Sequence, residues 1–286
     1  SSNFPKRTIS TPISELGIAG VGNGLALCGN KVIVEFMFAD FAFLAFDQII
    51  NFAAKTSTMY GKLLSHSILF RCPVGGHRGY GPTHSQSIQK FFMGIPNLDL
   101  YELSPLHDFT NILQPIMNSG NSAMLFESKT LYPLKNISTG TYKNIFKHIK
   151  LDQLTSHIFI ENNIDALIIS NGSMVYDCLD AIEELFMEHE ISVHLINPFK
   201  IYPFDISVIL DFLNPTIPVF IIEEGTVGGS WCSEIISLIN LNIDEKINCY
   251  SVCSNDEIIP SSRHLEEIML VNKDDICNSI IKNLKI

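Results

Sequence analysis

Short apolar runs alternate with longer amphipathic segments along the first half of the chain. Runs rich in Val, Ile, Leu and Phe are typical of buried strands, whereas segments with apolar positions on one face are typical of helices. The pattern predicts strands at residues 31–37, 67–71, 98–103 and 123–127, and helices at residues 15–28, 41–60, 85–93 and 105–117. Such alternation favours a mainly parallel, doubly wound sheet.

The same alternation returns in the second half of the chain. Residues 128–163 are polar, with weak periodicity and several lysines, so we interpret them as the connection between two domains. Beyond them we predict strands at residues 166–170, 192–197, 219–223 and 248–252, and helices at residues 175–188, 205–213, 229–238 and 274–284. The predicted fold class is therefore α/β, with two doubly wound, mainly parallel-sheet domains at residues 1–130 and 161–286 and a linker at residues 131–160.

Composition and charge narrow the class of protein. With 286 residues, 46% hydrophobic and 17% charged, the chain can bury the cores of two globular domains. Its most apolar region, residues 32–54, is interrupted by Glu35, Asp40, Asp47 and Gln48, so we predict a soluble chain without a membrane span. A net charge of −11 argues against a nucleic-acid partner, which would need clustered Lys and Arg. The charge suits either solubility alone or a basic protein partner.

The seven cysteines are scattered, and most lie within apolar stretches. They do not have the spacing of a zinc site, and Cys249 and Cys253 are isolated from other Cys or His pairs. Buried, reduced thiols are typical of a cytosol or an organelle matrix, and the polar first ten residues are unlike a signal peptide. We therefore expect a cytoplasmic protein, or one of a mitochondrial or plastid matrix.

Three segments carry the candidate chemistry. Glu15 begins a helix of small and apolar residues in TPISELGIAG, the run EFMFADFAFLAFDQIINFAAK contains Phe41, and the glycine-rich loop, residues 75–86, contains His84. Loops at the carboxyl ends of parallel strands are where α/β proteins bind ligands. From the residues alone other roles stay open: Glu15 suits helix capping, Phe41 suits the core, and His84 suits a contact with loop backbone.

Together with FIIEEGTVGGSWCSEI, these phrases and the sequence THSQS resemble, in this order and over nearly the whole chain, one known family. It is the β subunit of the thiamin-diphosphate-dependent decarboxylating (first) component of 2-oxo acid dehydrogenase complexes, which act on pyruvate or branched-chain 2-oxo acids. The resemblance implies a transketolase-like pyrimidine-binding domain and a transketolase C-terminal-like domain. The first helix and strand of the family's first domain have no counterpart here. They would lie on another polypeptide or an earlier part of this one, or the sequence is shortened.

The resemblance also implies roles for particular residues. Glu15 matches the glutamate that hydrogen-bonds the cofactor's aminopyrimidine ring and favours its imino tautomer. Phe41 matches the aromatic residue that stacks on this ring, and His84 matches the histidine that contacts substrate and assists acyl transfer to a lipoyl arm. A structural potassium site, built largely from carbonyl oxygens, is implied at Ile68, Ile116, Met117, Ser119 and Asn121, with Ser119 where relatives have an aspartate.

The chain lacks the Gly-Asp-Gly motif and paired Asn that hold magnesium and the diphosphate in thiamin enzymes. The resemblance therefore implies that an α partner, or an α segment fused ahead of this sequence, holds magnesium, and that the assembly is a heterotetramer of two α and two β subunits. This assembly would decarboxylate a 2-oxo acid and pass the acyl group to lipoamide on the dihydrolipoyl acyltransferase core. Phe38-Ala39-Asp40 and THSQS are closer to the branched-chain enzymes. The alternatives are ketol transfer of the transketolase or deoxyxylulose-phosphate-synthase type, and a noncatalytic scaffold that retains the fold.

Two further features have expected roles. His77 and Arg78 place positive charge on the glycine-rich loop, where it could meet a substrate carboxylate. The run Gly228-Gly229-Ser230-Trp231 lacks the spacing of a phosphate-binding loop and has acidic neighbours. We expect it to form a tight turn that packs one subunit against another.

Overall fold

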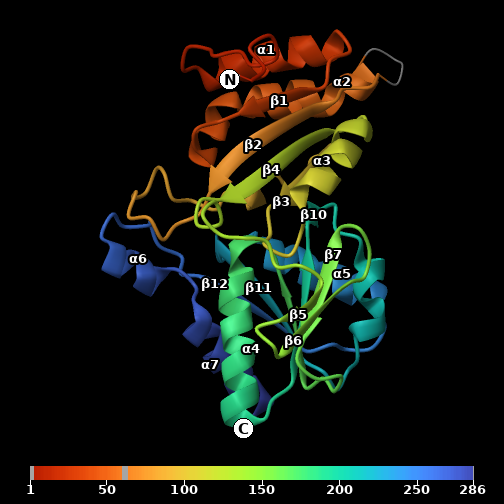
Figure 1. Ribbon diagram of the computed structural model, residues 1–286, viewed down its shortest axis with the longest axis vertical. Helices are drawn as coiled ribbons and strands as arrows, with labels where there is room; N and C mark the ends of the chain where they lie inside the picture. The colour runs from red at the N-terminus through yellow and green to blue at the C-terminus, as the bar shows by residue number, and fades with distance from the viewer. Residues whose placement is uncertain (1–2, 60–63, 286) are drawn as a thin grey trace.

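Two β-sheets, one mainly from each half of the chain, lie one above the other along the long axis of the molecule (Figure 1). The computed structural model describes residues 3–59 and 64–285. The first sheet has five strands in the order β1-β2-β4-β3-β10, and the second has seven in the order β12-β11-β8-β9-β7-β6-β5. Most neighbouring strands are parallel, so the predicted α/β class with two mainly parallel sheets is confirmed.

The first sheet contains every strand predicted in the first half of the chain. Its parallel strands are β1 (Val32–Glu35), β2 (Ile68–Val74), β3 (Leu98–Glu102) and β4 (Ser122–Ser128). A short strand from the second half, β10 (Lys200–Tyr202), pairs antiparallel with β3. The helices of this half are α1 (Glu15–Leu27), α2 (Ala54–Met59) and α3 (Phe109–Asn118). None of the helices in the described part of the chain is long and apolar enough to cross a bilayer.

One glycine of α1 lets the helix approach the sheet closely. A Cβ at Gly22 would lie 2.5 Å from Cγ2 of Val34 on β1, so no larger residue fits without movement. Gly24, in contrast, has nothing within 4 Å of that position. Glycine in a helix interior costs roughly 1 kcal/mol relative to alanine, and close packing against the sheet accounts for Gly22 but not for Gly24.

Two helix predictions were wrong in detail. Residues 41–59 do not form one α-helix but pass through η1 (Ala39–Ala45, 3-10), η2 (Gln48–Ala53, π) and α2, and residue 60 lies outside the described residues. In a 3-10 helix, side chains three residues apart lie on the same face. Phe43 and Phe46 are three residues apart, and both contact Phe92. Residues 85–93 contain only η3 (Gln89–Phe92), and the side chains of Gln86 and Ser87 before it are engaged by Asp40 and Glu224.

Arg71 links the carboxyl ends of three adjacent strands in the first sheet. Its Nε and Nη2 donate to the two carboxylate oxygens of Glu127 on β4, at 2.7 and 2.8 Å. Its Nη1 lies 3.0 Å from Oε2 of Glu35 on β1. The hydrogen bond to Glu127 raises the pKa of the guanidinium further. This pairing neutralises the buried Glu127 carboxylate beside the candidate site.

The second sheet combines a parallel and an antiparallel part. Its parallel strands are β8 (Ala166–Ser170), β9 (Val193–Pro198), β11 (Val219–Thr226) and β12 (Cys249–Ser254). The antiparallel strands are β5 (Gly140–Tyr142), β6 (Phe146–Lys150) and β7 (Thr155–Phe159). These three strands occupy much of the predicted linker at residues 131–160, which is therefore not a simple connection. The exact domain boundaries stay a prediction.

Helices cover both faces of the second sheet. On one face α4 (Val175–His189) lies against α7 (Lys273–Leu284), and on the other lies α5 (Trp231–Asn242), as Figure 1 shows. The shorter elements are η4 (Gly172–Met174), η5 (Ile206–Phe212) and α6 (Arg263–Met269). A single apolar core joins the two sheets and includes residues from both halves, among them Phe70, Phe126, Ile196, Ile221 and Trp231.

The side chain of Trp231 lies inside this chain. It is 0% exposed, and its Nε1 donates to the carbonyl oxygen of Ile201 at 3.0 Å. The tryptophan therefore anchors the start of α5 within this chain. Gly228 and Gly229 are exposed, and the packing of this turn against another subunit stays a prediction.

Candidate functional site

An aromatic cluster lies at the carboxyl ends of β1 and β2. Phe38 and Phe41 meet the imidazole of His84, with ring centroids 4.6 and 5.3 Å away and nearly perpendicular planes. Tyr80 meets Phe38 edge-on at 6.0 Å. The three rings of Phe38, Phe41 and His84 are half-buried, so each keeps part of its surface available to a ligand.

The topology of the first sheet explains why these residues meet. β1 and β2 are parallel neighbours, and their register pairs Glu35 with Arg71, so both strands end at the same edge of the sheet. Phe38 and Phe41 follow β1, and the glycine-rich loop follows β2. Gly75, Gly79 and Gly81 have φ values of +91°, +68° and +76°, which favour glycine. The ligand-binding edge expected for a parallel α/β sheet is thus built from these two connections.

One ring nitrogen of His84, Nδ1, lies within hydrogen-bond distance of a neighbouring side chain. Oγ1 of Thr83 lies 2.9 Å from Nδ1. A hydroxyl that donates to Nδ1 leaves the proton of the neutral ring on Nε2. Among the described residues no hydrogen bond involves Nε2. In that tautomer Nε2–H can donate a hydrogen bond to a bound substrate. In the other tautomer Nδ1–H donates to Thr83, and Nε2 can accept a proton from the substrate.

Glu15 is a buried carboxylate that does not cap its own helix. The amide of Gly17 donates to Oγ of Ser14, which is the N-cap of α1, so Ser14 performs the capping. Glu15 is 8% exposed and forms no hydrogen bond or ion pair through its carboxylate within residues 3–59 and 64–285. A carboxylate this buried, without a protein partner, is suited to receive a hydrogen bond from a ligand.

The three predicted residues are therefore placed in two groups. Phe41 and His84 are in ring contact. Glu15 begins α1, and α1 packs against η1, the element that carries Phe41. No hydrogen bond or ion pair joins Glu15 to either ring in the part of the chain that is described. The candidate site is thus an aromatic and imidazole cluster with a buried carboxylate on the neighbouring helix.

His77 and Arg78 are already engaged within the chain. Nε2 of His77 lies 3.8 Å from Oε2 of Glu224, and Nη2 of Arg78 donates to the carbonyl oxygen of Lys129 at 2.7 Å. Both side chains therefore support the conformation of the loop. The expected contact with a substrate carboxylate has no geometric support here.

Several side chains near the loop could not be recognised from the sequence. Lys129 follows β4, is 6% exposed, and places Nζ 5.6 Å from the centroid of the Phe38 ring. Burial lowers the pKa of its ammonium group to about 8. Glu224 on β11 and Glu266 on α6 accept hydrogen bonds from the loop. Glu224 directly follows the strand predicted at residues 219–223, and Lys129 lies two residues beyond the strand predicted at residues 123–127, whereas Glu266 follows neither.

At the positions of the expected potassium site, hydrogen bonds engage the carbonyl oxygen of Ile116 and the side chains of Ser119 and Asn121. The carbonyl oxygen of Ile116 accepts from both the amide and the hydroxyl of Ser119, at 3.2 and 2.8 Å. Nδ2 of Asn121 donates to Asp99 at 3.2 Å, and Asp99 pairs with Lys200 at 2.9 Å. Because a carbonyl oxygen has two lone pairs, Ile116 has little capacity left for a cation. The potassium site stays a prediction.

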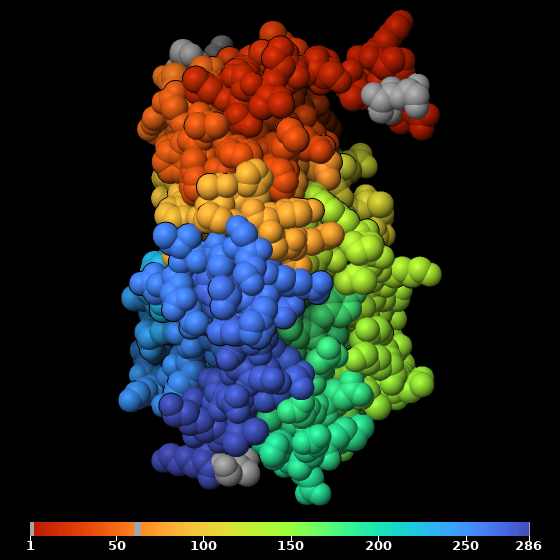
Figure 2. All heavy atoms as spheres, turned by 90° about the vertical axis from the view of Figure 1, so that its left-hand side faces the viewer, coloured from red at the N-terminus to blue at the C-terminus, as the bar shows by residue number. Residues whose placement is uncertain are grey.

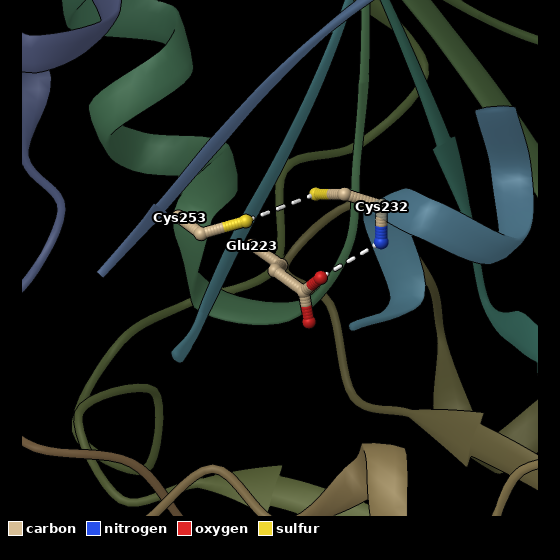
Figure 3. A group of neighbouring side chains, drawn as sticks. All are labelled: Glu223, Cys232 and Cys253. Carbon is tan, nitrogen blue, oxygen red and sulfur yellow. Dashed lines mark hydrogen bonds between the residues drawn. The ribbon is translucent and has the colours of Figure 1, made fainter. Parts of the chain in front are cut away.

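A second group of side chains lies in the other half of the chain and contains two thiols (Figure 3). Sγ of Cys253 lies 3.5 Å from Sγ of Cys232, and the amide of Cys232 donates to Oε1 of Glu223 at 2.7 Å. Burial raises the pKa of the Cys232 thiol and of the Glu223 carboxyl. A thiol or carboxyl group must lose its proton to bind a metal, whereas burial here favours the protonated forms. The thiols are therefore better suited to hydrogen bonding than to metal binding. We assign no metal to the group.

The comparisons with known proteins agree with this architecture. The family described as transketolase, pyrimidine binding domain, matches residues 1–135, and transketolase, C-terminal domain, matches residues 158–276. The chain is 30% identical over 290 residues to the mitochondrial pyruvate dehydrogenase E1 component subunit beta of Bos taurus, covering 98% of this chain and 78% of that protein. It is 29% identical over 276 residues to the 2-oxoisovalerate dehydrogenase subunit beta of Bacillus subtilis, covering 95% and 82%.

A solved structure shares the fold. It is described as a split gene transketolase, inactive beta4 tetramer, and matches with a TM-score of 0.72 and 17% identity over 99% of this chain and 86% of that one. The stacked sheets and the two matched domains define a transketolase-like protein. Within that class, the chain belongs to the family of β subunits of the E1 component of 2-oxo acid dehydrogenases. The resemblance noted in the sequence is confirmed.

Proposed function

We propose that this chain supplies the pyrimidine-binding half of a thiamin diphosphate site in a 2-oxo acid dehydrogenase. The observation that carries the proposal is the pairing of Phe41 with His84, together with a buried carboxylate, Glu15, on the neighbouring helix α1, which has no hydrogen-bond or ion-pair partner among the described residues. A flat heterocycle needs an aromatic surface and an acid at its edge, and these residues fit that requirement. When bound, thiamin diphosphate supplies the carbanion that attacks a 2-oxo acid.

Each residue has a defined task in this proposal. Glu15 holds a hydrogen bond to the pyrimidine ring, and the burial of its carboxylate strengthens that bond. Phe41 supports one face of the ring. His84 directs Nε2 toward the substrate and moves a proton during acyl transfer to lipoamide, since Thr83 engages Nδ1.

The remaining parts of the reaction require partners. We propose an α subunit that holds magnesium and the diphosphate, a second β copy in a tetramer of two α and two β chains, and a lipoyl-bearing dihydrolipoyl acyltransferase core. The substrate is a small 2-oxo acid. The sequence Phe38-Ala39-Asp40 supports a branched-chain acid over pyruvate. The proposed compartment is the cytoplasm or an organelle matrix.

The test uses Glu15→Gln in the assembled α and β complex. Because the carboxylate favours the reactive tautomer, we expect a loss of at least about 100-fold in kcat for 2-oxo acid turnover, in the range of a general acid or base. Thermal unfolding should change little. Turnover is measured by acyl transfer to lipoamide, together with the Kd for thiamin diphosphate.

Ser14→Ala is the matched control, because it removes the helix cap and leaves the carboxylate in place. It should lower the stability of the complex by about 1 kcal/mol and preserve kcat. Full turnover in Glu15→Gln would leave Glu15 with a structural role only. That result would favour the noncatalytic scaffold.

A further inference from the structure

We propose that two carboxylates of the second half of the chain, Glu224 and Glu266, hold the glycine-rich loop and thereby position His84. This inference rests on the role proposed above for His84 in acyl transfer. Neither carboxylate belongs to the first sheet, where the aromatic cluster is built. Both are therefore positioning residues that act through the loop.

Glu224 ties together the two ends of the loop. Its Oε1 accepts from the amide of Gly76 at 2.9 Å and from Oγ of Ser87 at 2.8 Å. Gly76 lies near the start of the loop, and Ser87 directly follows its end. Glu224 is only 8% exposed; its bond to Gly76 is buried, which shields it from competing water, and its bond to Ser87 is partly buried. One buried oxygen atom thus fixes both ends of the segment that carries His84.

Glu266 holds the loop at a third point. Its Oε2 accepts from the amide of Gly79 at 2.9 Å, and the residue is 0% exposed. The loop also packs closely against the residues just before α6, because a Cβ at Gly81 would lie 2.4 Å from Oγ of Ser261. Figure 2 shows the orange atoms that follow β2 seated on the blue atoms of the segment containing α6.

The hydrogen bonds of Glu224 and Glu266 can position His84 because the loop is closed on itself. The amide of Gly75 donates to the carbonyl oxygen of Gln86 at 3.4 Å, and Nε2 of Gln86 donates to Oδ1 of Asp40, next to Phe41, at 2.8 Å. His84 lies between the points held at Gly79 and Gln86. A shift of the loop would therefore move the imidazole relative to the ring of Phe41.

The first readout is amide hydrogen exchange of the full chain. Glu224→Ala removes the acceptor for Gly76 and Ser87, so exchange across residues 75–86 should become at least about 10-fold faster, as local opening becomes more frequent. Glu224→Gln keeps a side-chain oxygen acceptor and should restore most of the protection. Ser87→Ala is a milder variant that removes one donor without leaving an acid unpaired. Glu267→Gln, an exposed neighbour of Glu266 on α6, is the control and should leave exchange unchanged.

The second readout is a double-mutant cycle in the assembled complex, measured as acyl transfer to lipoamide. A misplacement of about 1 Å can lower the rate on the order of 100-fold, so Glu224→Ala should lower kcat by about 10-fold to 100-fold with a smaller effect on KM. If Glu224 acts through His84, the double variant with His84→Ala should be no slower than His84→Ala alone.

Unchanged exchange in Glu224→Ala and Ser87→Ala, or fully additive losses in the cycle, would overturn the inference. The two proposals fail in different ways. A wild-type complex that turns over no 2-oxo acid would reject the proposed function, whereas the exchange of the Gly76 and Gly79 amides still decides whether the carboxylates hold the loop.

Discussion

Glu102 gives the sharpest test of how the two halves of the chain fit together. It lies at the end of β3 and is 5% exposed, and one of its oxygens accepts from Nε2 of Gln89 at 2.9 Å. Gly172, in the second half of the chain, packs directly on the carboxyl group of Glu102. A Cβ at this glycine would lie 1.8 Å from the other carboxyl oxygen. Burial, assisted by the negative charges of Glu223 and Glu224, raises the pKa of Glu102 to about 8.

The raised pKa makes the folded protein less stable as the pH rises. Between its ordinary pKa of 4.5 and about 8, Glu102 is protonated in the folded chain and ionised in the unfolded chain. The unfolded state therefore binds fewer protons, and the free energy of unfolding falls through this window. Each tenfold change in proton affinity corresponds to about 1.4 kcal/mol, so this group should remove about 3 kcal/mol of stability between pH 5 and pH 8.

Glu102→Gln removes this titration and keeps an oxygen that can accept from Gln89. Urea unfolding at pH values from 5 to 8.5 should show wild-type stability falling by about 3 kcal/mol more than that of the variant. At pH 8 the variant should be the more stable protein. Glu161→Gln, at an exposed position, should follow the wild-type curve. Parallel curves for wild type and Glu102→Gln would show that Glu102 is ionised in the folded chain and would refute the reasoning.

Three further outcomes are expected. Arg71→Ala removes the cationic partner of the buried Glu127 carboxylate and leaves only the Tyr132 hydroxyl donating to it, so it should lower the free energy of unfolding by about 3 to 5 kcal/mol; a loss below 1 kcal/mol in urea unfolding would contradict the pairing. Trp231→Ala should cost about 3 to 5 kcal/mol by the same assay, because the indole is fully buried. Cys28 is exposed, whereas burial raises the pKa of Cys232, so iodoacetamide at pH 7.5 should label Cys28 first; equal rates by peptide mass spectrometry would count against the buried assignment.

The central elements of both sheets could be predicted because their sequence signals are strong. β8 was predicted at residues 166–170 and occupies those residues, and α4 extends one residue beyond the predicted end at residue 188. Parallel strands covered on both faces are continuous apolar runs, which are easily recognised. Strand β5 (Gly140–Tyr142), in contrast, is short, carries no apolar run and lies at the edge of its sheet. The sequence therefore gave no strand signal there.

The part of the candidate site that lies on two neighbouring strand connections could be predicted from the sequence. The contact between Phe41 and His84 follows from two connections at the same edge of one sheet. The roles of Glu224 and Glu266 depend on how the two halves pack. Glu224 meets Gly76 across 148 residues of sequence, and Glu266 meets Gly79 across 187. No local pattern encodes such contacts, so they became visible only in the structure.

If this chain completes an active site that decarboxylates 2-oxo acids, the α subunit should release carbon dioxide only in its presence. This is measured with carboxyl-labelled 2-oxo acids, as labelled carbon dioxide, with and without this chain. We expect release that requires both subunits and thiamin diphosphate, with a branched-chain acid preferred over pyruvate. No release from any 2-oxo acid, with turnover of ketose phosphates instead, would identify a ketol-transferring enzyme.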